Sequence, residues 1–113
     1  MNLDAKINEN SYSLAENLNN KKKELENSLG VLASDGVYAF YVFCKSKKIW
    51  NKIEEHLKPL KKYVSCNNSQ PMDQKYFAKI SGDLHTLLFV KEILEKTLTY
   101  TRYHLKAMES KNE

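Results

Sequence analysis

The feature that most constrains the fold is a helical stripe in the last third of the chain. Residues recur there in steps of three and four, which places them on one face of an α-helix. The stripe runs through Phe77, Ile80, Leu84, Leu87, Lys91, Leu94, Leu98, Thr101, Leu105 and Met108. Only Lys91 and Thr101 are not apolar. The pattern predicts a long C-terminal amphipathic helix, which needs partner helices to cover its apolar face.

Length and composition favour a small helical domain. The 113 residues include only 3 Gly and 2 Pro, so the chain has few residues for the turns of an all-β fold. We therefore expect an all-α fold, a bundle of four to five helices that forms one domain over residues 1–113. The first ten residues are expected to fray, as chain ends often do.

The same composition sets the expected cellular context. No apolar run is long enough to span a bilayer, and the first residues contain no apolar signal-peptide segment. The expected location is the cytoplasm. Two cysteines, Cys44 and Cys66, are too few for a disulfide framework, and we expect two free thiols there.

Weaker helical patterns precede the C-terminal stripe. Between residues 3 and 33, leucine and isoleucine recur eleven residues apart, which predicts one nearly straight helix. Its members are Leu3, Ile7, Leu14, Leu18, Leu25 and Leu29. Gly36 is the expected end of this helix. The next segment, Val37–Cys44, is apolar throughout, so periodicity does not distinguish helix from strand. We predict a buried helix, because a single strand without a partner is not stable.

The remaining segments alternate between helix and loop. A stripe over residues 48–64 contains Pro59, which predicts a break near Lys58. Residues 65–72 have the composition of a loop, and residues 73–80 that of a short helix. Ser81 either caps a new helix or lies within one that continues through Gly82. The unchanged phase of the stripe favours continuity.

No catalytic or metal-binding motif is recognisable. The chain has no Gly-rich phosphate loop, no G-x-S-x-G and no C-x-x-C. The histidines, His56, His85 and His104, are far apart and have no neighbouring cysteine for zinc. Helical ribonucleases of the HEPN type have a longer spacing between Arg and His than Arg102 and His104, which point to different faces. We expect no enzyme, no catalytic residue, no metal and no cofactor.

Basic residues concentrate in the middle of the chain. Residues 45–64 have a net charge of +5, compared with −2 for residues 1–44 and +1 for residues 65–113. A positive surface attracts phosphate backbones without reading their sequence. The alternative is a solvated lysine face in a lysine-rich chain. Trp50 and Tyr63 lie among these lysines, where they either stack on bases or belong to the core.

A second basic cluster lies near the end of the chain. Arg102 and Lys106 are four residues apart and share a helix face. Arg102 is the only arginine. Arginine binds phosphate with two parallel hydrogen bonds, whereas lysine acts as a point charge.

Two stretches resemble the small subunit of type III CRISPR effector complexes. Leu32–Lys47, LASDGVYAFYVFCKSK, is similar to a segment in which a polar turn with glycine opens an aromatic, apolar helix that ends in lysines. Gln74–Ser110 is similar to the closing helix of that subunit, which also ends in aromatic and basic residues. The resemblance is nearer to the Cmr (III-B) branch, although residues 57–64 and 89–103 also resemble the Csm (III-A) subunit.

The resemblance implies a non-catalytic, all-α subunit that acts in antiviral defence. Copies would stack head to tail along the effector complex and flank the duplex of guide RNA and target RNA. The implied partners are both RNA backbones, other effector subunits and copies of the chain itself, with no membrane and no small-molecule substrate. From the charge pattern we assign RNA-backbone binding to Lys45, Lys47, Lys48, Lys52, Lys61, Lys62 and Arg102.

Two other functions are compatible with the sequence. One is a protein–protein interaction module of the immunity or antitoxin-like kind, which a large exposed apolar patch would favour. The other is a small homodimer that binds nucleic acid. Its single arginine argues against this function, because arginine is the residue that most often contacts base edges. The sequence leaves open the CRISPR branch, the oligomeric state, the choice between RNA and DNA, and the protein partners.

Overall fold

The computed structural model describes residues 3–64 and 70–110, but not the side chains of Lys62, Val64 and Ser110. All the regular structure within these residues is helical. The elements are α1 (Leu3–Asn17), α2 (Lys22–Asp35), α3 (Val37–Ser46), α4 (Trp50–Leu57), the 3-10 helix η1 (Lys58–Val64), α5 (Gln74–Ile80) and α6 (Leu84–Ser110). The predicted all-α class is confirmed. None of these helices combines the length and apolar character that a bilayer span needs.

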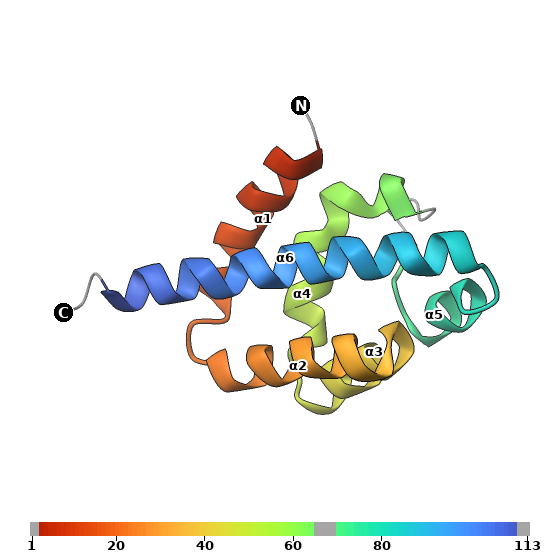
Figure 1. Cartoon of the computed structure of the whole chain (residues 1–113), viewed down its shortest axis with the longest axis horizontal. Helices are drawn as coiled ribbons and strands as arrows, with labels where there is room; N and C mark the ends of the chain where they lie inside the picture. Colours follow the sequence, from red (N-terminus) through yellow and green to blue (C-terminus); the bar gives the residue numbers. More distant parts are fainter. Residues whose placement is uncertain (1–2, 65–69, 111–113) are drawn as a thin grey trace.

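Helix α6 is the element on which the others are arranged. It runs along the longest dimension of the molecule, which is 47 Å (Figure 1). Helices α1 and α2 both pack against α6 and not against each other. Leu94 and Leu98 are buried, as the stripe predicted. Neighbours on both sides of α6 widen its buried face, which also includes Val90, Ile93 and Thr97.

The single helix predicted for residues 3–33 is two helices. The chain turns between Leu18 and Lys21, where Asn19 and Asn20 lie, because asparagine side chains compete with helical backbone hydrogen bonds. The predicted fraying is wrong for residues 3–10, since they are helical and Ile7 is buried against the core. Residues 1–2 lie outside the described part.

Helices α2 and α3 form a hairpin joined by Gly36 (Figure 1). Gly36 ends α2, as predicted, with φ 94°, a conformation that residues with a Cβ seldom adopt. Its N–H donates to the carbonyl of Leu32. The helix predicted for Val37–Cys44 is confirmed, and it buries Phe40 and Cys44 in the core.

The second half follows the predicted breaks with one exception. Helix α4 gives way to η1 at Lys58, before Pro59. Most of the loop predicted for residues 65–72 lies outside the described part. The predicted continuity across Ser81–Asp83 is wrong, because Gly82 disfavours a helix and Asp83 caps a new one. The Asp83 carboxylate accepts hydrogen bonds from the N–H and hydroxyl of Thr86, at 3.3 and 2.8 Å.

Candidate anion-binding sites

Three exposed lysines, Lys45, Lys47 and Lys48, lie together where α3 turns into α4. We call this group the basic corner. Helix α3 ends there in a Schellman motif, in which the Ile49 N–H donates to the Cys44 carbonyl at 3.0 Å and the Lys48 N–H to that of Lys45 at 3.1 Å. Ile49 and Cys44 are buried. The motif therefore turns the backbone inward and leaves the three lysines on the outside.

Lys48 adopts a conformation that usually requires glycine. Its φ is +62°, in the left-handed region, which costs about 1–2 kcal/mol for a residue with a Cβ. Strained residues of this kind cluster at functional sites. A cation at the end of α3 also interacts favourably with the helix dipole, which offsets part of the cost. The turn thus holds a positive charge at the corner at the expense of backbone strain.

The basic corner borders an open hollow of about 260 Å³, lined by Lys45, Lys48, Trp50 and Asn51. None of these four residues is acidic. Lys47 is not part of this lining, and its ammonium group lies 5.7 Å from the centre of the Phe43 ring, in a cation–π arrangement. The corner therefore presents positive charge without a neutralising carboxylate along the hollow.

Another of the predicted lysines, Lys52, already has a partner within the fold. The Lys52 ammonium donates to the carbonyl of Asn17 at 3.1 Å, and so satisfies a backbone acceptor at the C-terminal end of α1. The side chain of Lys62 lies outside the described part of the chain.

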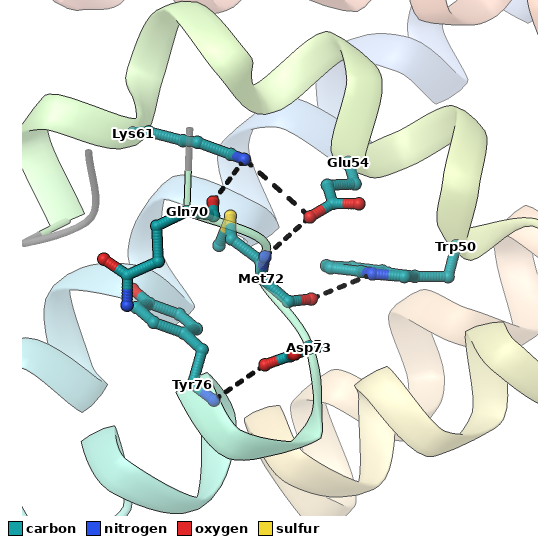
Figure 2. Close-up of polar contacts among 7 residues, drawn as sticks. All are labelled: Trp50, Glu54, Lys61, Gln70, Met72, Asp73 and Tyr76. Carbon is teal, nitrogen blue, oxygen red and sulfur yellow. Dashed lines mark hydrogen bonds and ion pairs between the residues drawn. The ribbon is translucent and has the colours of Figure 1, made fainter. Parts of the chain in front are cut away.

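The prediction that Lys61 binds RNA is wrong, because its side chain is only 3% exposed. Its ammonium donates to the Gln70 carbonyl at 2.7 Å and lies 3.8 Å from the carboxylate of Glu54 (Figure 2). The same Glu54 oxygen accepts the N–H of Met72 at 2.6 Å. Lys61 therefore fixes the segment before α5 against α4 and η1.

Trp50 belongs to the core rather than to a base-stacking surface. It is buried, and its ring packs edge-on against Phe40, Tyr41 and Phe77. The indole N–H donates to the Met72 carbonyl at 3.0 Å (Figure 2). Tyr63, the other aromatic residue of the basic segment, packs partly buried against the core.

Arg102 lies at a different place from the basic corner. It lines a pocket of about 160 Å³ between α2 and α6, together with Lys22, Leu25, Glu26, Leu105, Lys106 and Glu109. Arg102 and Lys106 share this pocket, as their spacing predicted. Lys22 and Glu109 form an ion pair. The Nε of Arg102 is buried and has no hydrogen-bond partner among the described residues.

His104 faces away from Arg102. Its ring packs edge-on against Tyr12 at 5.4 Å between ring centres, and its Nε2 lies 3.1 Å from the amide oxygen of Asn8. Arg102 therefore lies on the side of α6 that faces α2, and His104 lies on the side that faces α1. In residues 3–64 and 70–110, no three His, Cys, Asp or Glu side chains are grouped as a metal site would need.

An exposed apolar surface lies at the start of α6, where the sequence pattern predicted a buried face. Leu84, which the stripe placed on the buried face, is 65% exposed, and Leu88 is 55% exposed. Phe89 is exposed beside them. We call these three residues the apolar end of α6. The break at Ser81–Asp83 explains the difference for Leu84, because it interrupts the helix that would have kept Leu84 on one face with the buried Phe77 and Ile80.

Comparison of the chain with protein-family models, with curated proteins and with solved structures gave no match. The resemblance of Leu32–Lys47 and Gln74–Ser110 to the type III CRISPR small subunit therefore stays a prediction.

Proposed function

We propose that this chain is a non-catalytic RNA-binding subunit that holds the phosphate backbone of RNA at its basic corner. The observation that supports this most directly is the group of three exposed lysines, two of which, Lys45 and Lys48, line a hollow whose lining has no acidic residue. Lysines contact phosphates as point charges and carry no base-reading geometry. Binding through this surface would be independent of RNA sequence and would weaken steeply with salt.

The resemblance gives the proposal its specific form. In a type III CRISPR effector complex, the partners would be the guide and target RNA backbones, neighbouring effector subunits and further copies of the chain. The lysines that end Leu32–Lys47 overlap the basic corner, so the resemblance and the charge pattern favour the same surface. This form of the proposal places the protein in the cytoplasm.

The test is binding to a single-stranded RNA and to a guide–target RNA duplex across a salt series. The corner variant replaces Lys45, Lys47 and Lys48 with Gln. The matched control replaces three exposed lysines of α2, η1 and α5, namely Lys23, Lys58 and Lys75, and removes the same charge. We expect the corner variant to lower the slope of log affinity against log salt on single strands by about 2, because each phosphate contact contributes about 0.7.

The control variant should change this slope much less, and both variants should keep the far-UV helical signal. Equal losses in the two variants would show that total charge, and not the basic corner, determines binding. No binding to either RNA at low salt would overturn the proposal.

A specific observation also favours a protein-interaction module, namely the exposed apolar end of α6. In that case, a protein partner purified with the wild-type chain would also be purified with the corner variant. A variant with Leu84→Gln and Leu88→Gln would lose it. The opposite pattern would exclude this second function.

A further inference from the structure

The pocket between α2 and α6 contains a charged donor without an acceptor. The Nε of Arg102 is buried there, and among the described residues nothing accepts its hydrogen. Buried polar groups in folded proteins are almost always paired with protein, water or an ion. Arg102 also makes no ion pair within the described part of the chain, although Glu26 and Glu109 line the same pocket. The protein therefore provides no acceptor for the Nε–H of Arg102 within the described part of the chain.

The pocket is lined by three cations, Arg102 included, and by two carboxylates, so its balance of charge is positive and favours a negatively charged ligand. Lys22 and Lys106 line the pocket from α2 and α6. Leu25 and Leu105 are buried beside it, and such apolar neighbours lower the local dielectric and strengthen the attraction to an anion. Lys22 is also the first residue of α2, and no side chain caps this helix end. The positive end of the helix dipole therefore adds to the charge of the lysines.

We propose that this pocket binds a phosphate group through Arg102, with Lys22 and Lys106 as additional cations. A guanidinium donates two parallel hydrogen bonds to phosphate oxygens, and Nε takes part in one such pair. Lys22 then exchanges its partner, Glu109, for the phosphate. At about 160 Å³ the pocket is smaller than the ~300–1,000 Å³ of sites for drug-sized ligands, so it holds the phosphate and leaves the rest of the ligand outside.

The site does not depend on the basic corner. It accepts either free phosphate or the terminal phosphate of an RNA strand, and the two sources share the same chemistry. Because Arg102 is the only arginine, its Nε–H gives the only arginine signal of that kind in a ¹⁵N–¹H NMR spectrum. This signal reports on the pocket directly and is insensitive to phosphate held by lysines elsewhere.

The experiment titrates inorganic phosphate into the ¹⁵N-labelled chain and into the corner variant. We expect a saturable shift of the Arg102 signal in both, since the corner lysines are not needed. The same titration with two short RNA strands, identical except for a 5′-phosphate or a 5′-hydroxyl, separates the sources. A shift with the phosphorylated strand alone assigns the site to RNA ends, and a shift with inorganic phosphate but with neither strand assigns it to a free anion.

The phosphate affinities of variants test the assignment of the site to Arg102 without using the NMR signal. Arg102→Gln should weaken phosphate binding by about tenfold or more, as expected for the loss of a charge-assisted pair. Lys96→Gln removes a charge from a different face of α6, where Lys96 pairs with Asp4 and Glu92, and should leave binding unchanged. Arg102→Lys keeps the charge and should also bind phosphate more weakly, which covers the case of an unstable Gln variant.

An Arg102 signal that is unmoved by inorganic phosphate and by both RNA strands overturns the inference. Equal phosphate affinity in wild type and both Arg102 variants does the same. Neither result would bear on the basic corner, whose own test is the loss of RNA binding in the corner variant.

Discussion

The ammonium group of Lys61 and the carboxylate of Glu54 lie 3.8 Å apart, with the Lys61 side chain almost completely buried (Figure 2). A lysine is rarely buried without a partner. Here Glu54 balances its charge and the Gln70 carbonyl accepts one of its hydrogens. The pair therefore acts inside the fold, although it lies in the most basic part of the sequence.

We expect Lys61→Ala to lower the free energy of unfolding by about 1–3 kcal/mol, because the Gln70 carbonyl loses its donor and Glu54 loses its countercharge. Urea unfolding measures this change. Lys45→Ala is the control, since Lys45 is exposed, and it should stay within about 0.5 kcal/mol of wild type. Equal effects of the two substitutions would mean that the buried pair does not form in solution.

Lys48→Gly should stabilise the fold by up to about 1.5 kcal/mol. Glycine relieves about 1–2 kcal/mol of strain at φ +62°, and the greater freedom of the unfolded chain takes back about 0.4–1 kcal/mol. Lys47→Gly removes the same charge at φ −93° and should destabilise by about 0.5–1 kcal/mol. Thermal unfolding of both variants tests the opposite signs, and a loss of stability in both would contradict the left-handed turn.

Two leucines on α6 should respond differently to truncation. Leu98 is 0% exposed, and Leu98→Ala should cost about 2–5 kcal/mol, as for other buried leucines. Leu88 belongs to the apolar end of α6, and Leu88→Ala should change stability by no more than about 0.5 kcal/mol. Urea unfolding compares them on one helix. A large cost for Leu88→Ala would show that its surface is covered in solution.

Burial of Cys44 makes stability depend on alkaline pH. Burial raises the pKa of this thiol from 9.0 to about 12, despite the opposing hydrogen bond with Ser28. Its contribution to stability is complete below pH 9.0, where the thiol is protonated in both states. Above that value the unfolded thiol ionises first, so this contribution falls by up to about 1.4 kcal/mol per pH unit until the folded thiol also ionises.

Urea unfolding of wild type and Cys44→Ala at about pH 8 and about pH 10 measures this effect. We expect the variant to be less stable at the lower pH, because it leaves a cavity. Its further loss at the higher pH should be smaller than that of wild type. Identical losses would show that the thiol is not buried.

Patterns that depend on nearby residues were the predictable part of the fold. The steps of three and four fixed the buried face of α6 around Leu94 and Leu98, and Pro59 marked the end of α4. The turn at Asn19 was not predictable from spacing. Leu14 and Leu25 keep an eleven-residue interval whether the chain between them is helical or turns, so the same pattern fits one helix or two.

In the candidate sites, too, only the features that depend on nearby residues were predictable. Arg102 and Lys106 share a face because of their local spacing, whereas the position of Lys22 beside them depends on how α2 packs on α6. In sequence Lys61 resembled the exposed Lys58, because its burial depends on Glu54 and on the later segment that begins at Gln70. Charge counts along the chain therefore located the basic corner but could not separate it from an internal ion pair.

The position of α6 has a consequence for how the chain folds. Helices α1 and α2 come first in the sequence but rest on the last helix, and the hydroxyl of Ser11 bonds the Thr97 carbonyl across 86 residues. During synthesis, both early helices leave the ribosome before α6, although α2 can already pack on α3 and α1 on α4. The faces that they turn toward α6 stay uncovered until it has been made, so this part of the core closes after the rest.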